Sequence, residues 1–314
     1  MMTTPDITVV TPSYRNDFEL AVDLCRSLDA HFQARFDHVL IVPRRDLALF
    51  SRLASTHRRV LTKEDVLRSH GFRKLPTPTR VRIPGLVELK FREQWWCAGA
   101  GRVSGWVVQQ IIKLSAPDFT AAPVLLFIDS DVFFFKDFDA TRLYSGDFVK
   151  LHRYATGSEL ASHQAWYQTA LRLLGVTRDA PPMMNYIGSL VAWRRDVLLA
   201  LRLRLEAVNG QAWRLVIARC RTISEYILYG AYCSAVAPQG TGHVFEDLRL
   251  AHALWTPGTE ADIPAVAAAV RDEHVAIHVQ STMPLTIVRR RALIGAILAE
   301  LQPAPVRDTA GAAA

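Results

Sequence analysis

Short apolar runs alternate with amphipathic segments along the first part of the chain. The β-branched run Ile7–Val10 ends at Thr11-Pro12, which predicts a buried strand followed by a loop. Leucines recur at helical spacing in Phe18–Phe32, which predicts an amphipathic helix. His38–Val42 predicts a second strand, and Leu47–Leu53 a second helix. This order is typical of the opening of a doubly wound α/β domain with parallel strands.

The most apolar predicted strand is Pro123–Ile128 (PVLLFI), which we expect at the centre of the sheet. Before it, Ser69–Val87 is rich in Pro, Arg and Thr without a clear period, which predicts a long connection. Trp95–Leu114 is predicted to form a helix. Later elements are predicted strands at Tyr186–Trp193 and Val275–Val279 and predicted helices at Asp196–Val208, Ile223–Tyr232 and Leu285–Leu301.

These elements predict an α/β fold with a doubly wound, mostly parallel sheet flanked by helices. We expect one domain over residues 1–284, which fits a chain of 314 residues. A basic amphipathic helix is expected over 285–302. The tail 303–314 has little apolar material to pack and is expected to be disordered.

The net charge is +7, and most of the excess comes from arginines spread along the chain. Such an excess favours anionic partners, namely nucleotide phosphates, acidic glycans or an anionic membrane surface. A purely solubilising surface explains it equally well. No recognition motif for nucleic acid accompanies the charge, so a nucleic-acid partner is disfavoured.

The cysteines form no Cys-x-x-Cys pair, which favours buried thiols in a reducing compartment over a disulfide framework or a zinc site. The first residues carry no basic and apolar leader, and no apolar run approaches the ~20 residues that span a bilayer. We therefore expect a cytoplasmic protein, with peripheral contact at the inner membrane face as an option for the C-terminal basic helix.

Two carboxylates follow the most apolar predicted strand, in the sequence Asp129-Ser130-Asp131. Ligands bind beyond the carboxyl ends of strands in open parallel sheets, so these side chains should face a ligand. Neighbouring carboxylates repel each other and need a cation to stay ionised when buried. A hard divalent ion, Mn²⁺ or Mg²⁺, shared with phosphates satisfies that need. The alternative is a solvated turn, which the flanking LLFI and VFFF disfavour.

The segments ITVVTPSYR, LLFIDSDV and IHVQS, in this order, resemble GT-A nucleotide-sugar glycosyltransferases. The resemblance extends over roughly residues 5–285. It is strongest to a little-characterised bacterial group with a QQ-x-x-K helix before the DSD and an SEY-x-x-YG helix after it. It implies a GT-A-like fold and transfer of a sugar from a nucleotide-sugar donor to a glycan or lipid-linked acceptor. It further implies a role in bacterial surface polysaccharide synthesis.

The resemblance also implies site residues. Asp129 and Asp131 would hold a divalent metal that bridges the two donor phosphates, with Asp131 as the direct ligand. The first strand and its loop, together with Ser130, would bind the nucleotide. Tyr14 would stack on the base and Arg15 would pair with phosphate, with Thr11 beside them. The alternative for these loop residues is ordinary turn chemistry.

His278 is the second candidate metal ligand. Strand alternation places it on the face opposite Val275, Ile277 and Val279, and a neutral imidazole is a competent ligand for Mn²⁺. In several GT-A families a late histidine completes the metal site. In one retaining group it opens a His-x-x-Gly-x-x-Lys-Pro pattern, from which this chain departs with Ser281 in place of glycine. A structural strand histidine is the alternative.

Glu225 opens the predicted helix that contains ILYGAY. In inverting GT-A enzymes a carboxylate on such a helix deprotonates the acceptor hydroxyl, which makes Glu225 the candidate catalytic base. The alternative is a first-turn acid that the helix dipole favours.

Further candidates for donor or acceptor binding are Gln110 and Lys113, one helical turn apart, and Asn185 after a proline-rich loop. Gly188 would allow a close backbone approach there. Trp95, Trp96 and Trp166 are candidate sugar platforms, although tryptophan is more often a core residue.

Two rival functions stay open. A haloacid-dehalogenase-like phosphohydrolase also uses a strand-end Asp-x-Asp, but it needs Thr or Val where this chain has Phe133. A GT-A-like domain that binds nucleotide or glycan without turnover is the other. Substitution of Asp131 would separate a catalyst from a metal-independent binder.

Overall fold

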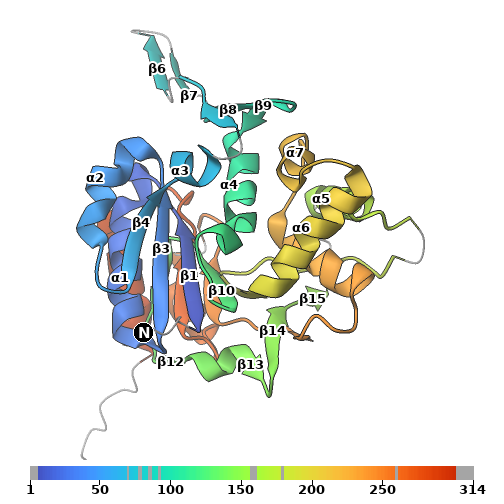
Figure 1. Cartoon of the computed structure of the whole chain (residues 1–314). Coiled ribbons are helices and arrows are strands. Elements are labelled where there is room, and N and C mark those ends of the chain that lie inside the picture. Colours follow the sequence, from blue (N-terminus) through green and yellow to red (C-terminus); the bar gives the residue numbers. More distant parts are fainter. Residues whose placement is uncertain are drawn as a thin grey trace, which may run out of the picture.

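The computed structural model describes residues 6–68, 71–76, 80–83, 87–90, 93–155, 161–177, 180–258 and 261–301 (Figure 1). The predicted tail 303–314 lies outside the described residues. The helices are α1 (Phe18–His31), α2 (Leu47–Phe50), α3 (Lys63–Arg68), α4 (Gly105–Leu114), α5 (Ala161–Leu174), α6 (Arg195–Asn209), α7 (Trp213–Ala218), α8 (Glu225–Ala231), α9 (Ile263–Ala268) and α10 (Ile287–Glu300).

The central sheet has five strands in the order β17-β10-β1-β3-β4. They are β1 (Ile7–Pro12), β3 (Phe36–Val42), β4 (Arg58–Thr62), β10 (Val124–Ile128) and β17 (Leu190–Arg194). β1 runs parallel to both β10 and β3, β3 runs parallel to β4, and only β17 is antiparallel within this sheet. The predicted α/β fold with a mostly parallel sheet is confirmed, and the mixed sheet flanked by helices is consistent with a GT-A-like domain.

Helices cover both faces of this sheet. One face, which includes Val10 and Phe127, packs against α4, α5, α6 and α8. The other face, which includes Val9 and Leu126, packs against α1. β1 and β10 are buried along their whole length, as expected for continuous apolar strands inside a two-faced sheet.

A smaller sheet continues from the end of β10, with the order β11-β20-β19. Its strands are β11 (Val132–Phe134), β19 (Ala251–Leu254) and β20 (Ala276–Val279). β11 begins directly after Asp131 and runs antiparallel to β20, with Val132 opposite His278. This register brings the late histidine beside the acidic pair.

The remaining strands are short and form separate two- and three-stranded sheets. They are β2 (Phe32–Gln33), β5 (Phe72–Lys74), β6 (Arg80–Ile83), β7 (Val87–Lys90), β8 (Gln94–Cys97), β9 (Gly101–Ser104), β12 (Phe138–Asp139), β13 (Tyr144–Ser145), β14 (Phe148–His152), β15 (Tyr154–Ala155), β16 (Met184–Asn185) and β18 (His243–Glu246).

Three predicted elements were wrong in extent. The helix predicted over Trp95–Leu114 begins only at Gly105, because β8 and β9 form a hairpin. Gly99 in its turn and Gly101 at the start of β9 have φ values of 81° and 74°. The predicted connection Ser69–Val87 contains β5 and β6 among its described residues. The strand predicted over Tyr186–Trp193 begins only at Leu190.

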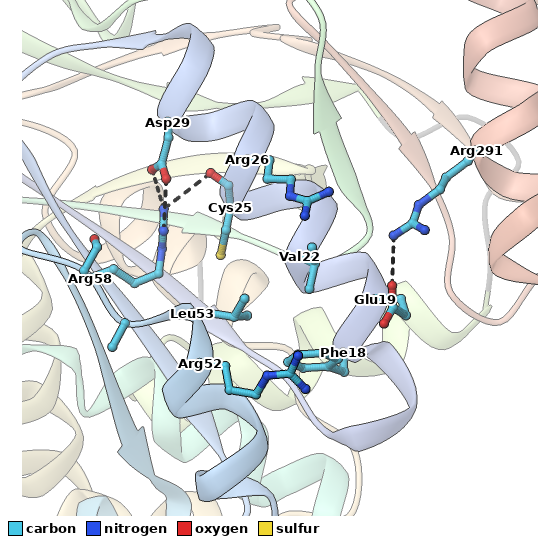
Figure 2. Close-up of a pocket in the computed structure, with 12 residues that line it drawn as sticks. Phe18, Glu19, Val22, Cys25, Arg26, Asp29, Arg52, Leu53, Arg58 and Arg291 are labelled. Atoms are coloured by element: carbon cyan, nitrogen blue, oxygen red, sulfur yellow. Dashed lines mark hydrogen bonds and ion pairs between the residues drawn. The ribbon is translucent and has the colours of Figure 1, made fainter.

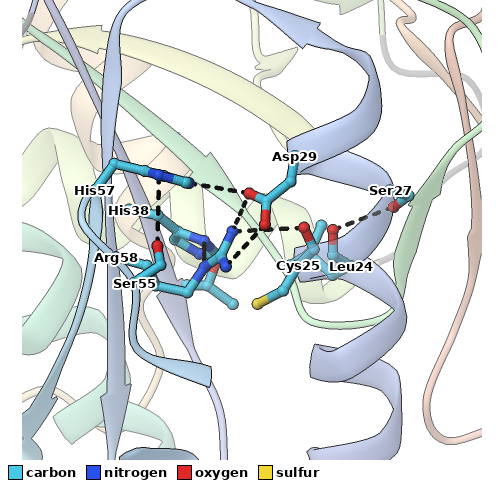
Figure 3. Close-up of polar contacts among 9 residues, drawn as sticks. Leu24, Cys25, Ser27, Asp29, His38, Ser55, His57 and Arg58 are labelled. Atoms are coloured by element: carbon cyan, nitrogen blue, oxygen red, sulfur yellow. Dashed lines mark hydrogen bonds and ion pairs between the residues drawn. The ribbon is translucent and has the colours of Figure 1, made fainter. Parts of the chain in front are cut away.

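A buried polar cluster joins α1 to β3 and β4 (Figure 3). The Arg58 Nε–H donates to His38 Nδ1 at 2.8 Å, and the Arg58 guanidinium also pairs with Asp29. His38 Nε2 lies 3.0 Å from Thr11 Oγ1, inside the sheet. These contacts satisfy polar groups that the sheet would otherwise bury without partners.

The C-terminal helix α10 packs on the domain through Leu293, Ile294 and Ile297. Arg291 pairs with the α1 carboxylates of Glu19 and Asp23. Arg291 and Glu19 line a hollow of about 550 Å³ (Figure 2). Two of the three consecutive arginines therefore make contacts within the chain, since Arg290 donates to the Val279 and Gln280 carbonyls. Among the described helices, none is long and apolar enough to cross a membrane.

Candidate active site

A cavity of about 300 Å³, here called the first cavity, lies where β1 and β10 end. Its walls come from the loop after β1, the DSD segment and the residues that follow β20. This is the carboxyl edge of the parallel strands, where open α/β sheets bind ligands. The predicted position of the site is therefore the position of a real cavity.

The Asp131 carboxylate is nearly buried at the floor of this cavity. Its Oδ2 accepts a hydrogen bond from the Ser281 N–H at 2.6 Å. Its Oδ1 lies 3.1 Å from His278 Nε2 but has no hydrogen-bond partner among the described residues. Burial raises the pKa of Asp131, but His278 and the Ser281 N–H outweigh it, so the pKa lies below its ordinary value. Asp131 is thus held as a carboxylate whose Oδ1 faces the His278 imidazole.

His278 is fixed from its other side. Its Nδ1 lies 2.8 Å from Ser189 Oγ, and its ring meets that of Trp255 edge to face at 4.7 Å. This hydrogen bond orients the ring so that Nε2 faces Asp131, as a ligating histidine is commonly oriented by a partner on its second nitrogen.

Asp131 and His278 fit a divalent cation. Adjacent ligands around an octahedral Mg²⁺- or Mn²⁺-like ion are about 3 Å apart, which is the spacing of Asp131 Oδ1 and His278 Nε2. Carboxylate and imidazole together suit Mn²⁺. Within the described part of the chain, no three His, Cys, Asp or Glu side chains already form a metal-binding group. The remaining ligands would come from Asp129, water and substrate phosphate, as is usual for such ions.

Asp129 is held by a buried ion-pair network. Lys113 Nζ lies 3.6 Å from Asp129 Oδ1, 2.9 Å from Glu225 Oε1 and 3.0 Å from the Tyr226 hydroxyl. Burial alone would lower the pKa of Lys113, but Asp129 and Glu225 raise it well above its usual value. Gln110 completes the network, because its Oε1 accepts the Glu225 N–H at 3.1 Å. The QQ-x-x-K and SEY-x-x-YG motifs therefore meet behind Asp129.

Glu225 does not line the first cavity. Ser224 caps α8, and Glu225 is the first residue of this helix. This position is compatible with both roles considered for Glu225, the catalytic base and the first-turn acid. Its carboxylate is buried against Lys113, which stands between Glu225 and Asp129. The role of catalytic base stays a prediction, and the geometry favours a positioning role.

The predicted nucleotide-binding residues separate into two groups. Tyr14 and Ser130 line the first cavity. Thr11 is buried in the sheet, and the Arg15 guanidinium pairs with Asp46 at 3.1 Å, outside the cavity wall. Gln110 is likewise buried behind the wall, and the neighbouring Gln109 faces the cavity instead.

Asn185 lies in the wall of a second cavity, and its Nδ2 donates to the Tyr154 hydroxyl at 2.6 Å. Of the three tryptophans predicted as sugar platforms, none lines the first cavity. Trp95, in β8, is fully buried and is therefore a core residue.

The cavity residues that sequence reasoning missed include Asp17, Lys63, Trp106 and Trp255. Lys63 follows β4, so the strand-end rule that found Asp129 would have found it had that strand been predicted. Trp106 and Trp255 are about half exposed, at 48% and 47%, and offer ring surface to a ligand. Their position depends on loop geometry for which the sequence gives no signal.

The position of Asp17 in the cavity raises the pKa of its carboxyl group. Burial and then the charge of Asp131 raise its pKa to about 7. Because the folded pKa exceeds the unfolded value, Asp17 contributes stability that is full below about pH 4 and is lost as pH rises through 7. Without divalent ions, Asp17→Asn should be more stable than the wild type at pH 8, on the order of 1–2 kcal/mol after solvent screening, and similar at pH 4.

Urea unfolding at both pH values measures this difference. Equal stability of the two proteins at pH 8, or a less stable variant, would show that Asp17 is an ordinary exposed carboxylate.

The fold and the cavity define an α/β protein with an acidic site at the ends of its parallel strands. Residues 7–265 match the model described as a family of unknown function, DUF6492, and the chain belongs to this family. His278, Ser281 and Arg290 lie beyond the matched residues.

No curated protein matches the chain significantly. Among solved structures, the apo form of mouse xyloside xylosyltransferase 1 is similar at 10% identity and a TM-score of 0.46, over 90% of this chain and 100% of that chain. A likeness this distant assigns no activity to this chain.

Proposed function

We propose that this protein is a metal-dependent glycosyltransferase that moves a sugar from a nucleotide-sugar donor to an acceptor hydroxyl. The observation that carries the proposal is the pair Asp131 Oδ1 and His278 Nε2, 3.1 Å apart at the end of the sheet. The carboxylate and imidazole of this pair, and the spacing between them, suit a divalent cation shared with a diphosphate. We extend the proposal to bacterial surface polysaccharide synthesis on the motif resemblance alone.

The cavity residues have distinct roles in this proposal. Asp129, Asp131 and His278 would hold Mn²⁺ or Mg²⁺, which when bound offsets the charge that develops on the leaving diphosphate. Lys63 adds a positive side chain to the lining of the cavity. Tyr14 is 40% exposed and offers its ring to the base. Lys113 keeps Asp129 in place and is itself held by Glu225.

The transfer forms a bond between the acceptor oxygen and the anomeric carbon and breaks the bond from that carbon to the phosphate oxygen. The nucleoside diphosphate leaves with the electron pair, and a base accepts the hydroxyl proton. Glu225 is the base predicted from the sequence. Asp17 is the better-placed carboxylate, because it lines the first cavity and Glu225 does not.

Thermal unfolding with a panel of nucleotide-sugars and nucleotides, with and without Mn²⁺, tests the proposal. A ligand at 100 times its Kd stabilises the folded state by about 2.7 kcal/mol, which corresponds to a rise in Tm of several degrees. We expect such a rise for one class of nucleotide-sugar, lost on chelation of the metal and in Asp131→Asn. Asp147→Asn is the matched control, since Asp147 is exposed away from the cavity.

The alternatives give different results. A rise that survives chelation would remove the metal role of Asp131 and His278 and favour a non-catalytic binder. No rise with any ligand, together with hydrolysis of phosphate esters, would favour the phosphohydrolase.

A further inference from the structure

A second cavity, of about 870 Å³, lies beside the first. The two share Trp255. They also meet at the 2.8 Å contact between Ser189, from the second cavity, and His278, from the first. A molecule in the second cavity therefore lies next to the place where the proposed function puts the donor sugar.

The wall of the second cavity is basic and rich in imidazole. No carboxylate belongs to its lining in the part of the chain that the structure describes. Arg249 and Arg271 line it, together with the histidines His152, His163, His252 and His274. Burial lowers the pKa of His152, His252 and His274, the last to about 4, so these rings are neutral hydrogen-bonding groups at pH 7.

The two arginines are tethered from outside the cavity. Arg249 Nε pairs with Asp247 at 2.9 Å, and Arg271 Nη1 pairs with Glu273 at 3.2 Å. Both carboxylates are about half exposed and neither lines the cavity. The Arg249 guanidinium also lies over the Tyr154 ring, 4.8 Å from its centroid. A guanidinium has five N–H donors, so an arginine that one carboxylate orients can also bind a second anion.

His152 carries a buried polar atom without a partner. The side chain is nearly buried, at 5% exposure, and Nδ1 has no hydrogen-bond partner among the described residues. The nearest carboxylate oxygen, on Asp247, is 4.0 Å away. Gly188 makes room for this ring, since a Cβ there would lie 3.0 Å from His152 Cδ2. Buried polar atoms are normally satisfied, so this nitrogen points to a ligand group.

We propose that the second cavity binds the acceptor and that the acceptor is an acidic saccharide. A sugar hydroxyl donates to His152 Nδ1, a sugar face packs on the half-exposed Trp255 ring, and the acidic group pairs with Arg249 and Arg271. That the bound saccharide is the acceptor, with its reacting hydroxyl beside the donor, rests on the proposed function. That the second cavity binds an acidic saccharide does not depend on it.

Isothermal titration of the full chain with hexagalacturonate and with neutral maltohexaose, without donor or metal, tests this. We expect the acidic hexamer to bind at least tenfold more tightly than the neutral one. Arg249→Gln/Arg271→Gln should abolish that preference, and Trp255→Ala should weaken acidic binding at least tenfold. These side chains are about half exposed, so the variants should fold, which thermal unfolding checks.

The matched control is Arg73→Gln/Arg102→Gln, which removes two exposed arginines from β5 and β9. An equal loss in this control would assign the binding to overall charge and overturn the proposal, as would equal affinity for both hexamers. Because no nucleotide is present, failure here leaves the donor result untouched. Failure of the donor test likewise leaves saccharide binding as an independent result.

Discussion

Asp131→Asn is expected to lower the rate of metal-dependent sugar transfer about 10³-fold, equivalent to about 4 kcal/mol of transition-state stabilisation. The amide keeps the shape of the side chain and can still accept the Ser281 N–H, but it removes the charge on the oxygen that faces His278. The loss should therefore appear in catalysis and metal affinity. The fold should persist.

Once the donor is known, steady-state transfer assays with increasing Mn²⁺ measure this effect. His278→Asn should also lower metal affinity, since it removes the second converging atom. Asp147→Asn should retain full activity. A rate for Asp131→Asn within tenfold of the wild type would contradict the metal role of Asp131.

Lys113→Met is expected to produce the largest loss of stability, about 3–5 kcal/mol. It removes the cation from Glu225, whose side chain is 3% exposed, and leaves that carboxylate without its partner in the core. Adding Glu225→Gln to this variant should recover much of the loss, because the unpaired charge is then gone. Chemical denaturation of the two single variants and the double variant measures the coupling.

The control for this comparison is Lys150→Met. Lys150 pairs with Glu246 at 3.1 Å, but Glu246 is 44% exposed, so the loss should stay below about 1 kcal/mol. Additive effects of Lys113→Met and Glu225→Gln would contradict a buried network behind Asp129.

Local pattern was sufficient for the centre of the fold. The run before Asp129 is apolar at every position, and β10 is an interior strand of the sheet, although the central strand is β1 and not β10 as predicted. The strand-end rule then located the acidic pair in a cavity. Alternation in β20 indicated the face of His278, although only the pairing with β11 brings it to Asp131.

The partners of these residues could not be predicted. Glu225 and Lys113 form an ion pair across more than a hundred positions, and a helix-start acid gives no sign of such a partner. Thr11 was predicted to bind the nucleotide but is buried in the sheet. Because β1 is buried on both faces, the alternation of side chains along it does not indicate which of them reach the cavity. Trp95 was predicted to begin a helix but lies in the β8–β9 hairpin, because the glycine turn and the burial of the side chain outweigh helix propensity there.

The contact between Asp131 and Ser281 joins positions 150 residues apart. Arg290 donates to the carbonyls of Val279, the last residue of β20, and of Gln280. At about 5–20 residues per second, a ribosome makes the acidic pair about 8–30 s before the residues that complete its cavity. During that interval the nascent chain carries neither the imidazole nor the backbone donor for Asp131. A chain whose synthesis stops before this point never acquires the last wall of the cavity.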